Sequence, residues 1–170
     1  LREEVSYQNP SQKECQEKVM TVTVEQIKNL RAKTGLGIHD VKNALEQSGG
    51  DEVKAISWLK DKGLSTVAKK ADRATSQGLI ESYVHGGRLG AIVEVNCETD
   101  FVARNDDFKT FVKDIAMQVA SMNPENVDEL LRQDYFRDPS KTIQDLLNET
   151  ITKIGENIKI SRFSRFELGQ

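Results

Sequence analysis

Two alternating runs of residues lie on either side of a pair of glycines in the middle of the chain. The first run covers residues 79–84 and the second covers residues 89–96, with Gly86 and Gly87 between them. An alternation of period two is typical of β-strands, and glycine tolerates the positive φ angles of tight hairpin turns. We therefore predict an antiparallel β-hairpin, which places a sheet at the centre of the fold.

A long amphipathic helix is predicted after the hairpin, over residues 106–123. Its apolar residues recur at helical spacing and are Phe108, Phe111, Val112, Ile115, Val119 and Met122. Asp106 can cap the first turn, and Pro124 ends the helix because proline cannot continue it.

The rest of the C-terminal part predicts one more helix and one more strand. Residues 125–138 are interpreted as irregular or briefly helical. Apolar residues at helical spacing predict a helix over residues 141–154, which Gly155 stops. Residues 158–166 alternate again, so we expect a strand that rejoins the hairpin.

Residues 23–63 have the pattern of three short helices. Their expected boundaries are a capping box at Thr23 and Gln26, a glycine stop at residues 49–50, an N-cap at Asp51 and a final stop at Gly63. The buried stripes are expected to hold Val24, Ile27 and Leu30, then Val41, Ala44 and Leu45, then Ala55, Ile56, Trp58 and Leu59. Helices this short are unstable alone in water, so they must pack on one another.

These patterns together predict an α+β protein in four parts. Residues 1–21 lack periodicity and are interpreted as a disordered or processed extension. Residues 22–64 are expected to form a three-helix module and residues 65–76 a linker. Residues 77–170 are expected to form the core, an antiparallel three-stranded sheet packed with helices.

Composition narrows the classes of function. The chain has 170 residues with a formal net charge of -3, which gives no strong electrostatic footprint for nucleic acid. Its apolar stretches are too short to cross a bilayer. Cys15 and Cys97 are the only cysteines, too few and too far apart for a disulfide framework or a zinc site, so a reducing compartment is expected.

Catalytic or metal-binding chemistry finds little support. The candidate groups are the glycines at 35 and 37, His39, His85, Cys97, and the pair Glu98 and Asp100. The glycine pair follows a helix and lacks the lysine of a phosphate-binding loop. The two histidines have no further ligands at metal-binding spacing, and the cysteine is interpreted as a buried, inert thiol. The two carboxylates stand too close together to flank a hydrolysed bond, so neither an enzyme nor a cofactor is expected.

A short basic run, with Lys69, Lys70 and Arg73, leaves two interpretations open. A phosphate- or RNA-binding patch is one, and it would give a steep salt dependence of RNA affinity. A solvated connecting segment is the other, and it is favoured because short charge runs usually face solvent.

Residues 96–106 form a polar connection that contains one aromatic residue, Phe101. In one interpretation Phe101 tucks under the following helix as a hydrophobic staple. In the other it projects from the surface and inserts into a partner. Periodicity alone favours the first.

The same segment resembles the signature of the elongation factor Ts family. Residues 99–106, TDFVARND, carry the clearest resemblance. Residues 30–45, 49–59 and 154–158 resemble further parts of that family in the same order, so the similarity extends over residues 23–168.

The resemblance implies how the core would act. Members of the family promote GDP release from the GTPase elongation factor Tu, which they meet in its GDP-bound and nucleotide-free states. The exchange segment corresponds to Thr99, Asp100, Phe101 and Val102. It implies that Phe101 wedges into the GTPase near its Mg²⁺ and phosphate site, and that Asp100 assists by hydrogen bonding.

The resemblance also implies a docking role for the front helices. They resemble a ubiquitin-associated module that binds the nucleotide-binding domain of the GTPase, with contacts at Arg31, Ile38 and His39. Many members have two methionines where this chain has Ile38 and His39. An alternative is that the module binds ubiquitin or another helix-groove partner instead.

Chain length matches the short form of the family, because only residues 125–140 separate the long helix from the closing elements. Some short members dimerise, so a homodimer is a hypothesis for this chain. The family acts where bacterial-type translation runs, in the bacterial cytoplasm, plastids or mitochondria, and neither a membrane nor a nucleic-acid partner is expected.

Overall fold

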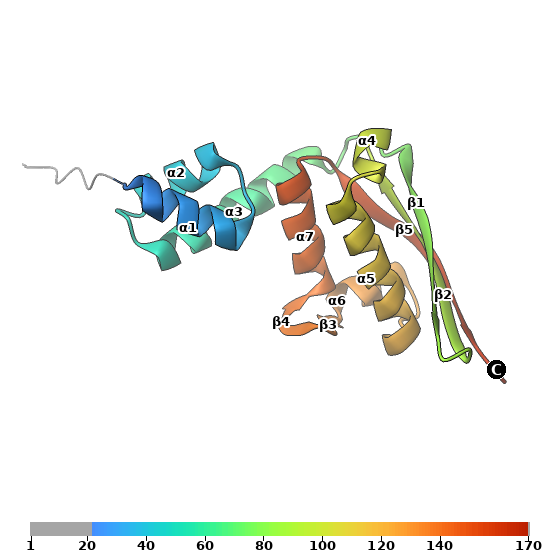
Figure 1. Cartoon of the computed structure of the whole chain (residues 1–170). Coiled ribbons are helices and arrows are strands. Elements are labelled where there is room, and N and C mark those ends of the chain that lie inside the picture. Colours follow the sequence, from blue (N-terminus) through green and yellow to red (C-terminus); the bar gives the residue numbers. More distant parts are fainter. Residues whose placement is uncertain (1–21, 170) are drawn as a thin grey trace, which may run out of the picture.

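A computed structural model describes residues 22–169, and the expectation for residues 1–21 lies outside this range. Figure 1 shows three helices at one end of the molecule and a sheet with its covering helices at the other. The helices are α1 (Val24–Thr34), α2 (Ile38–Gln47), α3 (Glu52–Lys70), α4 (Asp100–Ala103), α5 (Asp106–Met122), α6 (Val127–Arg132) and α7 (Ile143–Ile154). The strands are β1 (Gln77–His85), β2 (Leu89–Cys97), β3 (Asp134–Tyr135), β4 (Asp138–Thr142) and β5 (Ile158–Glu167).

Strands β1, β2 and β5 form an antiparallel sheet in the order β1-β2-β5. The predicted hairpin and the predicted return of the last strand are both confirmed. His85 pairs with Leu89 beside the turn, where Gly86 and Gly87 have φ angles of 55° and 67°. The protein is therefore α+β, as its sequence predicts.

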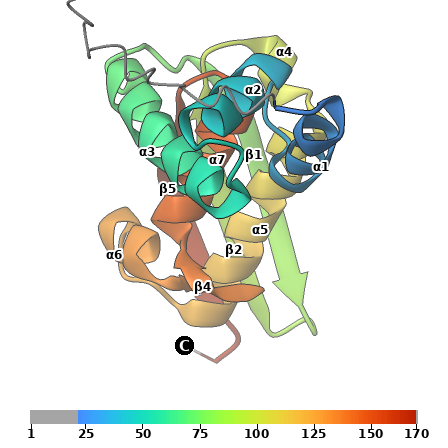
Figure 2. The ribbon, with the colours of Figure 1, turned by 90° about the vertical axis from the view of Figure 1, so that its left-hand side faces the viewer.

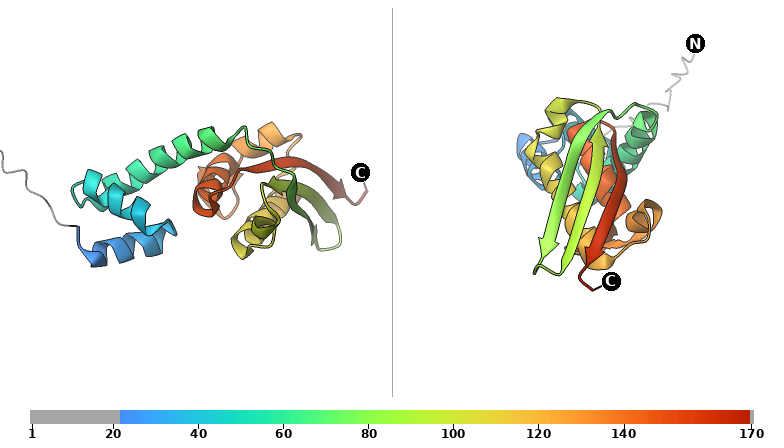
Figure 3. Two further views of the ribbon diagram at one scale, coloured as in Figure 1. Left: turned by 90° about the horizontal axis from the view of Figure 1, so that it is seen from above. Right: turned by 90° about the vertical axis from the view of Figure 1, so that its right-hand side faces the viewer.

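Helices α5 and α7 cover one face of this sheet, as the right-hand view of Figure 3 shows from the uncovered side. The alternation of β2 directs one set of side chains into the core: Ala91, Val93, Val95 and Cys97. The uncovered face leaves several apolar side chains exposed: Ile80, Val84, Ile92 and Phe166. The sheet thus has one face buried under the helices and one face exposed to solvent.

Helix α5 confirms the predicted long helix but corrects two of its details. Its N-cap is Asn105, whose side chain accepts a hydrogen bond of 2.8 Å from the Asp107 amide, and not Asp106. Met122 lies in the last turn and is exposed, although it was expected in the buried stripe. The helix ends at Asn123, which adopts a left-handed conformation with φ of 47°.

The segment before α7 contains a small hairpin, β3–β4, that the sequence did not predict. The brief helix expected in this region is α6. The expected start of the following helix at residue 141 is wrong, because β4 continues to Thr142. Thr142 and Asp145 form a capping box, and α7 begins at Ile143, two residues after the expected start.

The three front helices have a core of their own. Thr23 and Gln26 form the predicted capping box, with the Thr23 amide donating to Gln26 Oε1 at 2.9 Å. The fully buried residues are Leu30, Val41, Ala44, Leu45, Ala55 and Leu59. Val24 is 69% exposed and takes no part in this core, contrary to the prediction.

The predicted end of the third helix at Gly63 is wrong. Helix α3 continues to Lys70 and includes the first part of the predicted linker. Helix α3 packs against α7, and the two helices lie side by side in Figure 2. Gly63 is buried in α3 and lies at this contact. A Cβ atom at Gly63 would lie 3.0 Å from the hydroxyl oxygen of Thr152, so the glycine permits a close approach instead of stopping the helix. None of the helices within residues 22–169 is long and apolar enough to span a membrane.

Candidate partner-binding site

Phe101 lies on α4, a single turn of helix that connects β2 to α5 and was not predicted. Its side chain is 79% exposed, the highest value among the large apolar residues of the described chain. Val102 and Ala103, by contrast, are partly buried and pack against the main core. The staple interpretation of Phe101 is therefore wrong: the turn is anchored by its neighbours, and the ring projects into solvent.

Asp100 lies in the same turn and is partly exposed. Its Oδ2 atom lies 3.0 Å from a guanidinium nitrogen of Arg104, whose side chain is largely exposed. Exposed ion pairs of this spacing contribute little to stability. The Asp100 side chain is 48% exposed, so a partner can reach its carboxylate.

Thr99 sets the start of this turn. Its hydroxyl accepts a hydrogen bond of 3.4 Å from the Val102 amide, the usual contact of an N-cap. Its own amide and hydroxyl both donate to Glu156, at 3.0 and 2.7 Å. Sequence reasoning noted Glu156 within a motif but gave it no role, because its contact with Thr99 joins residues 57 positions apart.

The front helices present the other expected contact residues. Arg31 is exposed on α1, and Ile38 and His39 are exposed at the start of α2. Ile38 is 54% exposed although its helix buries three other apolar side chains. Helices α1 and α2 lie at the opposite end of the molecule from the sheet and α4 (Figure 1). The expected site residues therefore form two separate groups, one on the front helices and one around α4.

The basic run is largely engaged within the protein. Lys70 Nζ donates a 2.6 Å hydrogen bond to the carbonyl oxygen of Gly155. Arg73 lies 3.5 Å from the Glu98 carboxylate. Lys69 and Arg73 are both exposed, but Lys70 and Arg73 already have partners within the protein, which weighs against a phosphate- or RNA-binding patch.

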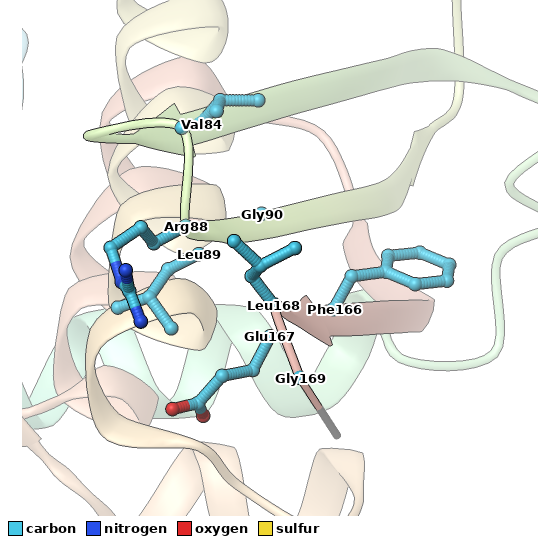
Figure 4. Close-up of a pocket in the computed structure, with 9 residues that line it drawn as sticks. Val84, Arg88, Leu89, Gly90, Phe166, Glu167, Leu168 and Gly169 are labelled. Atoms are coloured by element: carbon cyan, nitrogen blue, oxygen red, sulfur yellow. The ribbon is translucent and has the colours of Figure 1, made fainter.

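A shallow hollow lies at the hairpin end of the sheet (Figure 4). Its lining residues are Val84, Gly87, Arg88, Leu89, Gly90, Phe166, Glu167, Leu168 and Gly169. Strand β2 runs from this hollow toward α4, so the hollow and Phe101 lie at opposite ends of the sheet. Within residues 22–169, no group of three or more histidine, cysteine or acidic side chains is arranged to hold a metal ion.

Cys97 lies directly below the Phe101 turn, fully buried, with its Sγ atom 3.2 Å from the Thr99 carbonyl oxygen that accepts its hydrogen bond. Burial raises the pKa of the Cys97 thiol to about 11, and the negative charge of Glu156 adds to the rise. An inert structural thiol, as the sequence predicted, is consistent with this environment.

We expect Cys97 to resist alkylation in the folded protein at neutral pH. The rise of its pKa from 9.0 to about 11 lowers the thiolate fraction about a hundredfold, and burial blocks access further. Iodoacetamide labelling followed by peptide mass spectrometry measures this, with the urea-unfolded protein as the control. Equal labelling of the Cys97 peptide in both states would contradict the buried position.

Comparison with known proteins places these features in a family. Residues 98–170 match the family model described as Elongation factor TS. A protein named Elongation factor Ts from Thermoanaerobacter sp. (strain X514) is 43% identical over 195 aligned positions, which cover 88% of this chain and 96% of the relative.

Two further relatives with the same name give similar values. The protein from Caldanaerobacter subterraneus subsp. tengcongensis is 42% identical, covering 88% of this chain and 98% of the relative. The protein from Oleidesulfovibrio alaskensis is 43% identical, covering 87% of this chain and 98% of the relative. An alignment of 195 positions is longer than the 170 residues of this chain, so the first relative carries residues that have no counterpart here.

Proposed function

The chain belongs to the elongation factor Ts family, and on this premise we propose that it is a guanine-nucleotide exchange factor that promotes GDP release from elongation factor Tu during translation elongation. The observation that carries the proposal is the exposed Phe101 ring on an anchored helical turn. In this role the chain makes and breaks no covalent bond and needs no cofactor of its own. It acts wherever bacterial-type translation runs.

Exchange follows from differential binding. The factor must bind the nucleotide-free GTPase more tightly than the GDP-bound form. Thermodynamic linkage then requires that this protein and the nucleotide lower each other's affinity for the GTPase by the same ratio. No covalent step is needed. One contact that is more favourable with the nucleotide-free GTPase than with the GDP-bound form is enough.

Phe101 supplies that contact by inserting near the Mg²⁺ and phosphate site of the GTPase. Mg²⁺ requires near-ideal octahedral geometry at about 2.0–2.1 Å, so a small displacement of the elements that hold it weakens nucleotide binding. Burial of one phenylalanine side chain contributes roughly 1.5–3 kcal/mol. Asp100 accepts a hydrogen bond from the GTPase beside the ring, which its partly exposed carboxylate allows.

Residues 22–64 dock the factor on the nucleotide-binding domain of the GTPase, and residues 77–170 carry out the exchange. Ile38 offers an apolar contact because more than half of its side chain is exposed. His39 and Arg31 add polar contacts on the same three-helix bundle. The continuous helix α3 connects this bundle to the exchange domain.

A homodimer is a further part of the proposal. The uncovered face of the sheet exposes Ile80, Val84, Ile92 and Phe166, and exposed apolar patches commonly mark interfaces. A second copy of the chain would cover this face. Equilibrium sedimentation tests the idea: a monomer at concentrations that give full exchange activity would remove it.

The exchange function is tested by loading elongation factor Tu with fluorescent GDP and following its release into excess unlabelled GDP. We expect the release rate to rise with the concentration of this chain and to saturate. A release rate equal to the spontaneous rate at every concentration would refute the proposed function.

A further inference from the structure

The loop after α7 contacts the start of the turn that carries Phe101. Gly155 ends α7 in a left-handed conformation with φ of 88°, which turns the next residue, Glu156, away from the helix axis. One oxygen of its carboxylate accepts the Thr99 amide at 3.0 Å, and the other accepts the Thr99 hydroxyl at 2.7 Å. A single charged group therefore holds both the backbone and the side chain of the residue from which α4 begins.

Helix α4 depends on such support because it is so short. Four residues do not form a stable helix in isolation. The exposed Phe101 ring contributes little to holding the turn. Below the turn, Val102 and Ala103 pack on the core, and at its start the Thr99 cap is fixed by Glu156. Hydrogen bonds to a charged acceptor are shorter and stronger than neutral ones, so this cap sets the direction in which the turn presents Phe101.

The neighbours of Thr99 and Glu156 are also hydrogen-bonded to each other, with the acceptor now on the strand side. Glu98, which precedes Thr99, accepts a 2.6 Å hydrogen bond from the amide of Asn157, which follows Glu156. The Asn157 side chain is buried and donates to the carbonyl oxygens of Ala71 and Arg73, at 3.3 and 2.9 Å. The same loop therefore holds both the Phe101 turn and the residues that follow α3.

From these contacts we propose that Glu156 is a positioning residue for Phe101 in nucleotide exchange. It fixes the orientation of α4 relative to the loop at residues 155–157, and that loop in turn is fixed to the end of α3. The wedge is thereby held at a defined position relative to the docking bundle. This inference rests on the proposed exchange function and identifies a residue that acts through Phe101 without touching the GTPase.

A role of Glu156 in stability alone and a role in positioning Phe101 predict different effects of its loss. Glu156 holds Thr99 by hydrogen bonds and contributes no apolar side chain to either hydrophobic cluster. A positioning role predicts a lower maximal rate of GDP release with an unchanged half-saturating concentration, because docking depends on the front helices. General destabilisation would instead lower the amount of active protein and the melting temperature.

The test measures fluorescent GDP release from elongation factor Tu against factor concentration for Glu156→Ala and Glu156→Gln. We expect Glu156→Ala to lower the maximal rate at least about tenfold, since each of the two lost hydrogen bonds to a charged acceptor corresponds to a tenfold change or more. Glu156→Gln keeps one acceptor oxygen and the side-chain shape, so we expect a smaller loss and a normal fold by circular dichroism. The matched control is Glu149→Gln, which changes an exposed carboxylate on α7 that pairs with Lys141 of β4, and it should leave the rate unchanged.

A double-mutant cycle with Phe101→Ala tests whether Glu156 acts on the exchange rate through Phe101 or independently of it. In the Phe101→Ala background, Glu156→Gln should cause no further loss of rate, because there is no ring left to position. A loss of equal size in both backgrounds, or a wild-type rate for both Glu156 variants, would overturn the inference while the exchange function stands. If the wild-type chain itself fails to accelerate GDP release, the proposed function fails first, and the two failures are thus distinguishable.

Discussion

Replacing Phe101 with alanine should slow factor-stimulated GDP release from elongation factor Tu by about ten- to a hundredfold, because burial of one phenylalanine is worth roughly 1.5–3 kcal/mol and each tenfold change about 1.4 kcal/mol. The fold should be unaffected, since the ring is 79% exposed and makes little contact with the core. Stopped-flow release of fluorescent GDP measures the rate, and thermal unfolding measures the stability.

Met122→Ala is the matched control for this variant. Met122 is another exposed apolar side chain, but it lies at the far end of α5 from α4. It should retain the wild-type rate. The wedge mechanism would be contradicted by a Phe101→Ala variant that keeps full exchange activity, or by one that unfolds.

The second large effect concerns stability. Replacing Gln118 with leucine should lower the free energy of unfolding by about 2–4 kcal/mol, since each buried polar group left without a partner costs roughly 1–3 kcal/mol. The Gln118 side chain is fully buried, accepts a 3.0 Å hydrogen bond from the Phe136 amide and donates one of 3.0 Å to the Asp134 carbonyl oxygen. Leucine can satisfy neither group.

Urea unfolding followed by circular dichroism measures this loss. Gln144→Leu serves as the control, because Gln144 is exposed on α7 and its side chain donates a 3.1 Å hydrogen bond to the Asn148 side chain one turn away. A change below about 0.5 kcal/mol is expected there, as for most surface substitutions. If Gln118→Leu were equally mild, the hairpin β3–β4 would not depend on Gln118.

Periodicity predicted the elements that are long enough to show it. The hairpin, the closing strand and α5 have many residues whose burial repeats at one period, so their existence followed from the sequence. The capping box at Thr23 and Gln26 was equally visible, because it depends on residues three positions apart.

Elements of only about one period were missed. Helix α4 has four residues and β3 has two, so neither contains a repeat that could be recognised. The hairpin β3–β4 is instead held by buried polar contacts from α5: Gln118, and Asp114, which accepts a 2.7 Å hydrogen bond from the Tyr135 hydroxyl. Such partners are 16 to 21 residues apart and leave no local pattern.

Glycine gave the other misleading signal. Gly63 was interpreted as the end of the third helix, yet α3 passes through it because α7 approaches closely at Thr152. A glycine that stops a helix and one that admits a neighbour look the same in one sequence. Only the tertiary contact distinguishes them.

The candidate site was predictable only in part. The resemblance to a family pointed to Phe101, whereas periodicity alone favoured a buried ring. Its 79% exposure reverses that preference. The role inferred for Glu156 could not have been found locally, because its hydrogen bonds join two loops that are distant in the chain and meet only where the sheet and α7 end together.

The uninterrupted course of α3 has a consequence for how variants of this protein can differ in length. Each residue of an α-helix adds about 1.5 Å and turns the chain by about 100°. One inserted residue between Gly63 and Lys70 would therefore swing the front bundle to another side of the molecule, while substitutions on the solvent side of the helix would not. On the solvent side of this stretch, tolerance should be governed by residue number and not by residue identity.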